Sequence, residues 1–329
     1  MKVCLGCLED KKLHSGYCIK CIKEVFDGTT PKPLSFDKNE FYIQRRELAP
    51  RMSISGVQDK ISLKFEDKEL VTTATNGRYI LKPVPSSPQI KNQEDVVFNE
   101  HLSMLISKKI FKINTAACAL ISFSDGEMAY ITKRFDYTSN GLKYDQEDFA
   151  SILDVNSVKD GANYKYDAKN YLDCANAIKL KVPTAIIALE DFFKRIILNY
   201  LISNGDAHLK NFSLYSEPEN TDYRLTPNYD ILNTRYHVNE VYGDMGLELL
   251  DDYTKTFEAV GFYTYNDFYL FAKYLNMSDI RFNKILKQIN ESKDKVIDLV
   301  QNSFLSDKAK QYYIDSYLDR LKRVNYKII

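Results

Sequence analysis

Two polar side chains in one short segment, Asp206 and Asn211, have the types and the spacing that phosphoryl transfer requires. In that reaction a loop aspartate orients the acceptor hydroxyl and accepts its proton, and an asparagine five residues further on holds Mg²⁺. Lys210 of the same segment could steady the transferred phosphoryl group. The alternative is an Asx-rich turn in which His208 and Lys210 are only solvated. The segment alone does not decide between the two.

A second carboxylate that could serve this chemistry, Asp230, follows in the sequence PNYDI (227–231). Mg²⁺ prefers a few protein oxygens together with the phosphates of its substrate. Asn211 and Asp230 could therefore be the protein ligands that join this metal to a bound nucleotide.

Upstream segments contain groups that could hold the phosphates. Residues 53–60 (SISGVQDK) precede a strand-like pattern, where backbone N–H groups can cradle phosphate, although one glycine also fits an ordinary turn. Lys82 ends the apolar run at 79–81, so it can project from a strand into a cleft. Glu100 lies at helical spacing from apolar neighbours, which places a carboxylate on an apolar stripe.

A carboxylate on such a stripe needs a cationic partner if it is buried, and Lys82 is the natural candidate for Glu100. A strand lysine paired with a helix glutamate is the ion pair that positions the ATP phosphates in kinases. A surface charge at the helix edge is the alternative for Glu100. Chance readily explains one of these features, but not all of them in this order along the chain.

The elements that must position these groups change character along the chain. Between residues 53 and 134 the pattern is strand-like, and one helix at 94–109 interrupts it. From residue 146 the periodicity is helical, most clearly at 184–203. A β-rich half followed by a helical half is the layout of a two-lobed α+β kinase fold, although other folds share it. We expect strands at 61–65, 79–81, 117–123 and 128–132, and further helices at 166–180, 264–275, 281–303 and 306–323.

Four of the six cysteines lie near the start of the chain, in two Cys-x-x-Cys pairs formed by Cys4 with Cys7 and Cys18 with Cys21. Four thiolates suit tetrahedral Zn²⁺, and such a closed site is structural rather than catalytic. Free or redox-active thiols are the alternative, and His14 is a weaker ligand candidate. The segment is too short to hold a core of its own. We therefore expect metal to supply its folding energy, and metal removal to unfold it without affecting the rest of the chain.

Composition argues against several classes of protein. Lys plus Arg and Asp plus Glu both number 45, so the formal net charge is zero, whereas nucleic-acid-binding proteins usually carry a basic excess. No apolar run approaches the length of a membrane span, and the N-terminus lacks the apolar core of a signal peptide. We expect a cytoplasmic protein without direct nucleic-acid or membrane contacts.

Seven segments, taken in order, form a recognisable set: SISGVQDK (53–60), YILKP (79–83), NE (99–100), KRFD (133–136), QEDF (146–149), NGDAHLKNFS (204–213) and PNYDIL (227–232). This set resembles the signature motifs of HipA-type serine/threonine kinases, which are toxins of bacterial toxin–antitoxin systems. The resemblance extends over about residues 40–325 and is most specific in the Asp-His-Lys-Asn loop. It implies a two-lobed kinase fold, with an N-lobe at 36–135 and a helical C-lobe at 136–329. The cysteine segment, expected as a zinc module at 1–30, is a departure from the longer members of the family.

The resemblance also implies ATP and Mg²⁺ as cofactors and suggests a role for each residue. Asp206 would be the catalytic base, assisted by Lys210, and Asn211 and Asp230 would be the Mg²⁺ ligands. The family inactivates itself by autophosphorylation of a phosphate-loop serine, which here would be Ser53 or Ser55. Residues 131–135 would lie near the adenine, and the nucleotide contacts would be Ser55, Gly56, Val57, Lys82, Glu100, His208 and Phe135.

Partners follow from the same resemblance. Known targets in the family are aminoacyl-tRNA synthetases, whose inactivation halts translation, and a HipB-like helix-turn-helix antitoxin normally makes the DNA contacts. The chain resembles the shorter, HipT-like branch, in which a separate small protein can supply an N-terminal subdomain. The zinc module could replace that subdomain, dock a partner or brace the N-lobe.

Two competing functions are a catalytically silent kinase fold that binds a toxin–antitoxin partner, and a zinc-dependent nucleic-acid binder. The first is disfavoured because every expected phosphate, metal and base position holds a competent side chain. The second is disfavoured because phosphate contacts dominate nucleic-acid affinity and the net charge is zero.

Overall fold

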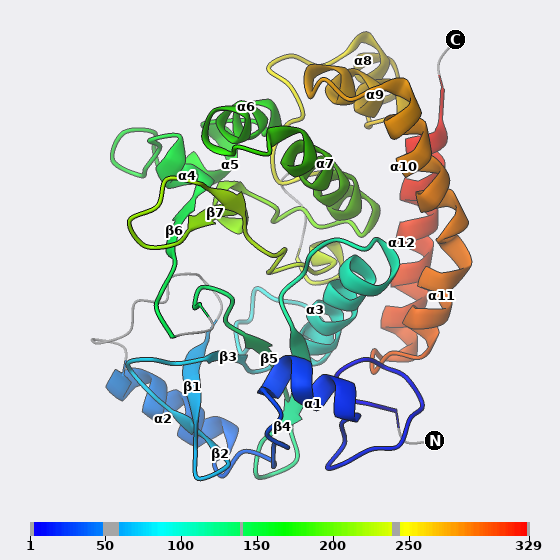
Figure 1. The fold of residues 1–329 in the computed structure, drawn as a ribbon. Coiled ribbons are helices and arrows are strands. Elements are labelled where there is room, and N and C mark those ends of the chain that lie inside the picture. The colour runs from blue at the N-terminus through cyan, green and yellow to red at the C-terminus, as the bar shows by residue number, and fades with distance from the viewer. Residues whose placement is uncertain (1–2, 49–58, 139–140, 239–243, 328–329) are drawn as a thin grey trace.

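The computed structural model describes residues 3–48, 59–138, 141–238 and 244–327, and they form a strand-rich half and a helical half (Figure 1). This arrangement confirms the predicted α+β, two-lobed fold. Residues 53–58 of the predicted phosphate loop, which include the candidate site residues Ser53, Ser55, Gly56 and Val57, lie outside the described residues. Among the residues that are described, no helix has both the length and the apolar character needed to cross a bilayer.

The N-terminal half is built on a five-stranded antiparallel sheet with the order β2-β1-β3-β5-β4, and helix α2 (Lys38–Leu48) precedes it. Four of the five strands coincide with predicted ones. Sequence reasoning missed β2 because Asp67 and Lys68 before it both have positive φ, a type I′ geometry that usually carries Asn or Gly. The strands are β1 (Ile61–Glu66), β2 (Glu69–Thr72), β3 (Tyr79–Lys82), β4 (Cys118–Ser122) and β5 (Met128–Lys133).

Helix α3 (Val96–Leu105) lies within the helix predicted at 94–109, and it packs against β4 and β5, between the sheet and the helical half (Figure 1). A 3-10 turn, η2 (Gln93–Asp95), precedes it, and one π-helical turn, η3 (Ile106–Ile110), continues it. Every residue of α3 except Phe98 is buried, and four of the buried side chains are polar. Buried polar groups need hydrogen-bond partners, so the contacts of these four side chains determine where the helix sits.

The C-terminal half is mainly helical and includes one small sheet with the order β6-β7-β8. Its strands are β6 (Asp145–Asp148), β7 (Ser213–Ser216) and β8 (Arg224–Leu225). Its helices are α4 (Phe149–Ile152), α5 (Tyr164–Asp167), α6 (Tyr171–Lys181), α7 (Ala185–Leu201), α8 (Lys255–Val260), α9 (Tyr265–Tyr274), α10 (Asp279–Glu291), α11 (Lys293–Gln301) and α12 (Asp307–Asn325).

Two predicted helices were wrong in their extent. The helix expected at 281–303 is divided into α10 and α11 at Ser292, whose hydroxyl donates to the carbonyl of Gln288 at 2.7 Å. Such back-bonding competes with the helical ladder and favours a break. The helix expected at 166–180 begins only at Tyr171, because Asn170 caps it in a capping box with Asp173.

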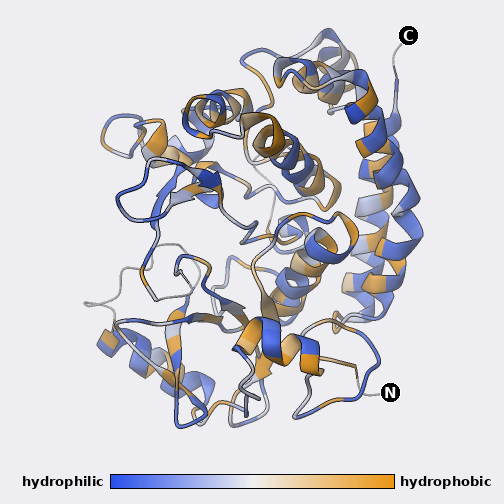
Figure 2. Cartoon of the chain, in the orientation of Figure 1, coloured by the Kyte–Doolittle hydropathy of each residue, from blue (hydrophilic) through white to orange (hydrophobic). Residues whose placement is uncertain are grey.

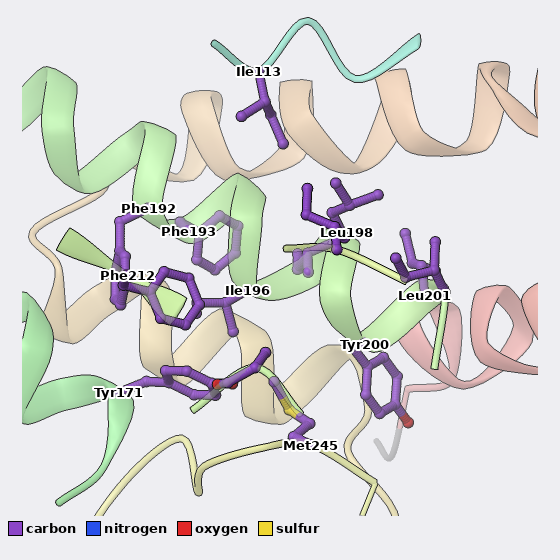
Figure 3. Packing of buried hydrophobic residues seen from close by; sticks show 14 of the residues in the cluster. Ile113, Tyr171, Phe192, Phe193, Ile196, Leu198, Tyr200, Leu201, Phe212 and Met245 are labelled. Atoms are coloured by element: carbon purple, nitrogen blue, oxygen red, sulfur yellow. The ribbon is translucent and has the colours of Figure 1, made fainter. Parts of the chain in front are cut away.

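Helix α7 forms the centre of the C-terminal core. Phe192, Phe193 and Ile196 on it are fully buried, and the ring of Phe192 meets that of Phe212 edge to face at 5.4 Å (Figure 3). Figure 2 shows hydrophobic residues concentrated along α7, whereas α11 and α12 are largely hydrophilic in this view. Because α7 is held by packing along its length, the 204–211 segment that follows it starts from a fixed point.

The cysteine-containing segment packs against the sheet instead of forming a core of its own. Helix α1 (Ile19–Phe26) places Phe26 in the same hydrophobic cluster as Tyr79 of β3. The N–H of Leu120 donates to the carbonyl of Leu5 at 3.0 Å, and the hydroxyl of Tyr17 donates to the carbonyl of Leu120 at 2.6 Å. These bonds cover the edge of strand β4. The module boundary at residue 30 stays a prediction, but this shared core argues against our expectation that unfolding the segment would leave the rest unaffected.

Helix α12 is tied to the middle of the chain by ion pairs around Asp244. The guanidinium of Arg320, which is only 1% exposed, lies 2.5 Å from the Asp244 carboxylate, and that of Arg323 lies at 3.2 Å. Arg323 also contacts Asp319 on its exposed side, at 2.8 Å. A buried guanidinium is stable only with a counter-charge. The pairs with Asp244 therefore connect α12 to the segment that begins at Asp244.

We expect Asp244→Asn to lower the free energy of unfolding by about 3 kcal/mol, because it leaves the buried Arg320 without its carboxylate. The matched control is Asp319→Asn, which removes an exposed carboxylate from Arg323 and should cost less than about 1 kcal/mol. Urea denaturation measures both values. Equal losses in the two variants would contradict the role given to Asp244.

Candidate active site

Lys82, Glu100 and Asp230 meet at the junction of the two halves. The Nζ atom of Lys82 lies 2.7 Å from Oε1 of Glu100 and 2.6 Å from Oδ1 of Asp230. Strand β3 supplies the lysine, α3 supplies the glutamate, and the segment after β8 supplies the aspartate. The Lys82–Glu100 pair predicted from the sequence is therefore present, and Asp230 joins it from the other half.

Burial governs the charges of these three groups. Lys82 and Glu100 have side-chain exposures of 7% and 1%, whereas that of Asp230 is 34%. Burial raises the pKa of Glu100 to about 7, despite the neighbouring ammonium. Burial also acts to raise the pKa of Asp230, but the charge and hydrogen bond of Lys82 outweigh it and hold that pKa below its usual range. Asp230 therefore stays ionised, and an ionised carboxylate is what its predicted role as a metal ligand requires.

The backbone at Asp230 has a left-handed conformation, with φ of 56°, which few residues other than Gly, Asn and Asp adopt readily. Tyr229, directly before it, packs its ring against that of Phe135 at 5.4 Å. Phe135 lies just beyond β5, where the resemblance placed the adenine. The turn at Asp230 thus brings its carboxylate to Lys82, while Tyr229 packs against Phe135, near the predicted adenine position.

The 204–211 segment contains the predicted Asx turn and also gathers its polar groups at one place. The N–H of Asp206 donates to the side chain of Asn204 at 3.2 Å, and the side-chain amide of Asn211 donates to the carbonyl of Asp206 at 2.7 Å. Nε2 of His208 lies 3.7 Å from the Asp206 carboxylate. The turn and the functional hypothesis are therefore compatible, because the turn itself sets the spacing of the two candidate catalytic groups.

Electrostatic contacts join this segment to Asp230. Burial lowers the pKa of His208, and the carboxylates of Asp206 and Asp230 both act on its ring in the opposite direction. Lys210 lies 3.8 Å from Asp148 at the start of α4. Lys60 lies in the same electrostatic environment. Burial lowers the pKa of Lys60, and the charges of Lys82, Asp230 and Lys210 also act on it.

Sequence reasoning missed three residues that hold or cover the 204–211 segment. The hydroxyl of Tyr171 donates to the carbonyl of Ala207 at 2.7 Å. A Cβ added at Gly246 would lie 2.5 Å from the Ala207 carbonyl carbon, so only glycine fits there. The hydroxyl of Tyr166 on α5 donates to Oδ1 of Asp206, and its ring packs edge to face on His208 at 5.0 Å. Only the tertiary structure brings them to this loop, and no local pattern in the sequence identifies them.

The candidate site thus combines described residues from four segments, namely β3, α3, the 204–211 segment and the segment after β8. Lys82 contacts both Glu100 and Asp230. Asp206, His208 and Asn211 contact one another around the turn. A lysine flanked by carboxylates can meet anionic phosphates, and the oxygens of Asp230 and Asn211 suit Mg²⁺. The roles of the individual residues stay predictions, including those of the phosphate-loop residues.

The four cysteines of the N-terminal segment form a second candidate site. The sulfur atoms of Cys4, Cys7, Cys18 and Cys21 all lie within 4.8 Å of one another, and His14 is not part of the group. The Cys7 and Cys18 sulfurs are 3.9 Å apart, close to the distance of about 3.8 Å between sulfurs in a tetrahedron with Zn–S bonds of 2.3 Å. Hydrogen bonds from the thiols of Cys21 and Cys7 lower the pKa of Cys4.

The backbone around these sulfurs has the form that a metal knuckle requires. The N–H groups of Gly6 and Cys18 point to the Cys4 sulfur, at 3.4 and 3.2 Å. A Cβ at Gly6 would lie 2.7 Å from the Cys21 sulfur, so glycine is needed for the loop to approach it. If all four sulfurs ionise, their charges repel at these distances, and a divalent cation would compensate them. The donor set and its geometry therefore fit Zn²⁺.

Comparisons with known proteins agree with this arrangement. A family described as HipA-like C-terminal domain matches residues 52–297. A Haemophilus influenzae protein named "Putative kinase" is 27% identical, and the alignment covers 98% of this chain and 97% of that protein. The serine/threonine-protein kinase toxin HipA of Shewanella oneidensis is 23% identical over 66% of this chain and 50% of its own length.

A solved structure shares the fold. Shewanella oneidensis HipA, determined in a complex with HipB and operator DNA, gives a TM-score of 0.63 at 19% identity, covering 88% of this chain and 71% of that one. The family match spans most of the chain and includes Lys82, Glu100, the 204–211 segment and Asp230. The chain therefore belongs to the family of HipA-like kinases.

Proposed function

We propose that this protein transfers the γ-phosphoryl group of ATP to a serine or threonine hydroxyl of a protein, in a reaction that requires Mg²⁺. The observation that carries the proposal is the contact of Lys82 with both Glu100 and Asp230. Such a lysine, oriented by a helix glutamate and placed beside a metal-binding aspartate, is the arrangement that positions ATP phosphates in kinases.

The chain's own residues take separate roles in this reaction. Asp206 accepts the proton of the attacking hydroxyl, and its position follows from the turn that it shares with Asn211. Lys82 orients the phosphates, and Lys210 steadies the group in transfer. Mg²⁺, held by Asn211 and Asp230, would neutralise the charge that develops on the phosphate oxygens. His208 stays neutral because its burial lowers its pKa, so it adds no charge beside Asp206.

Self-regulation and partners extend the proposal. Ser53 and Ser55 are the candidate sites of an inactivating autophosphorylation. The relationship to Shewanella oneidensis HipA, which was solved with HipB and operator DNA, supports a HipB-like antitoxin as a partner, and a small separate subdomain protein would be a further one. An aminoacyl-tRNA synthetase or another translation protein is the proposed target.

We further propose that Cys4, Cys7, Cys18 and Cys21 bind one structural Zn²⁺. The support is the mutual distance of their sulfurs and the close approach that Gly6 permits. The four sulfurs would fill all four coordination positions of the metal and leave none for an exchangeable ligand. This metal would therefore stabilise the fold and take no part in the reaction.

Asp206→Asn should lower phosphoryl transfer by about a hundredfold or more, because an amide cannot accept the proton. Binding of Mg-ATP should stay within about twofold of the wild type, since Asp206 is not proposed to hold the metal. Incubation with Mg-ATP, followed by intact mass and mapping of the peptides containing Ser53 and Ser55, measures transfer. Calorimetry measures binding.

Asp222→Asn, in the loop between β7 and β8, is the matched control and should behave as the wild type. Absence of phosphate on wild-type protein that was unmodified at the start would favour a silent, partner-binding fold. Near-native turnover of Asp206→Asn would instead show that another group is the base.

Tyr166→Phe should raise the initial rate of autophosphorylation by about tenfold, because the Tyr166 hydroxyl occupies the carboxylate oxygen that an acceptor needs. Tyr164→Phe removes a hydroxyl from the same short helix α5 and is the matched control. Rapid-quench assays with labelled ATP provide the rates. If the two variants have the same rate as the wild type, the Tyr166 contact does not limit access to Asp206.

Removal of the metal should lower the melting temperature of the protein by about 5 °C or more, because the cysteine segment shares its core with the sheet. Zinc content measured by mass spectrometry should be one ion per chain and should be lost in Cys7→Ser. Calorimetry of wild type with and without chelator measures the shift, and a chelator should have no further effect on Cys7→Ser. A wild-type transition that is unchanged after demonstrated zinc loss would contradict the shared core.

A further inference from the structure

Three consecutive buried residues of α3 contact three different parts of the molecule. Successive residues of a helix point about 100° apart, so Asn99, Glu100 and His101 face different neighbours. Glu100 contacts Lys82 of the sheet. The position of the Glu100 carboxylate therefore depends on what holds the residues on either side of it.

Asn99 is held by the C-terminal half. Its side-chain N–H donates to the backbone carbonyl of Asn233 at 2.9 Å, and the same nitrogen lies 2.8 Å from Nε2 of His237. Its side-chain oxygen accepts from the backbone N–H of Asn233 at 2.9 Å. Asn233 lies three residues after Asp230, so one side of α3 is tied to the segment that supplies the metal-binding carboxylate.

His101 is held by the cysteine loop. Its Nε2 atom lies 3.3 Å from the carbonyl oxygen of Gly6. A carbonyl can only accept, so the ring donates this hydrogen bond. Gly6 stands between Cys4 and Cys7, and its own N–H donates to the Cys4 sulfur at 3.4 Å. Gly6 thus connects the sulfur cluster to α3, because its N–H contacts the Cys4 sulfur and its carbonyl contacts His101, the residue next to Glu100.

A second contact joins the same loop to the turn that continues α3. The ammonium of Lys109 in η3 donates to the carbonyl of Cys7 at 2.8 Å and lies 2.5 Å from the carboxylate of Glu9. Lys108 beside it pairs with Glu24 of α1. The cysteine segment therefore contacts α3 at His101 and contacts η3, the turn that continues α3, at Lys108 and Lys109.

We infer that metal binding by the four cysteines positions Glu100 for ATP, and that His101 is the positioning residue that transmits it. Without metal the Cys4–Cys7 loop loses the constraint that aims the Gly6 carbonyl at His101, and a buried ring N–H is left without its acceptor. A shift or rotation of α3 relieves that cost and moves Glu100 away from Lys82. The inference rests on the proposed function, because the readout at Lys82 is nucleotide binding.

The test compares three proteins, each with its zinc and after chelation: wild type, His101→Gln and His101→Leu. Gln can place an amide N–H near the position of Nε2, whereas Leu has similar bulk and no donor. Two quantities are measured, namely hydrogen exchange of the α3 amides and the dissociation constant for Mg-AMP-PNP by calorimetry. Zinc content is determined for every sample.

We expect chelation of the wild type to speed exchange in α3 and to raise the dissociation constant by about tenfold. Zinc-loaded His101→Leu should already show the weaker binding with its zinc retained, and chelation should change it little further. His101→Gln should bind the nucleotide within about twofold of the wild type. This pattern separates a positioning role from simple loss of stability, because only one of two fully folded variants loses affinity.

Unchanged α3 exchange and nucleotide affinity after demonstrated zinc loss would overturn the inference. Equal affinities of His101→Gln and His101→Leu would overturn the role of His101. Should His101→Leu fail to fold, Lys109→Met tests the second contact by the same measurements, and an α3 that is insensitive to chelation in the wild type still overturns the inference. Changed α3 exchange in a protein that binds no nucleotide even with its zinc would refute the proposed kinase function and leave the structural coupling standing.

Discussion

The buried ammonium of Lys82 is the constraint on which the rest of the structure depends. A charge with 7% of its side chain exposed is stable only with carboxylates beside it, and the two that it contacts come from opposite halves of the molecule. Strand β3, helix α3 and the turn at Asp230 must therefore be correctly placed at the same time. This requirement ties the sheet, its covering helix and the helical half together at the point where phosphates would bind.

The helical half supports the other side of the site through rigid packing. Helix α7 leads into the 204–211 segment, Tyr171 holds the Ala207 carbonyl, and the backbone at Gly246 packs so closely on Ala207 that no side chain fits between them. The chain just before Gly246 is in turn anchored by Asp244 to the last helix. Elements far apart in the sequence thus fix one short turn, which suits a reaction in which positioning supplies most of the catalysis.

The cysteine segment belongs to this positioning system. It covers the edge of β4, shares a hydrophobic cluster with the sheet, and contacts α3 on the side opposite to the helical half. Of the three roles considered for it, bracing of the N-lobe is the one that these contacts support. With the proposed metal bound, this loop would hold the helix whose buried Glu100 pairs with Lys82.

Local spacing and periodicity in the sequence were enough to predict the candidate site residues, most of the strands and helices that carry them, and the two cysteine pairs, because such features are local. Lys82 at the end of an apolar run and Glu100 on an apolar stripe pointed to an ion pair, which the tertiary structure contains. The contact of Asp230 with the same lysine, the hydroxyl of Tyr166 on Asp206, and the bond from His101 to Gly6 were decided only by the tertiary structure. Each of these contacts joins residues 40 or more positions apart whose types fit many ordinary roles. The packing of whole elements chooses the partner and leaves no local pattern in the sequence.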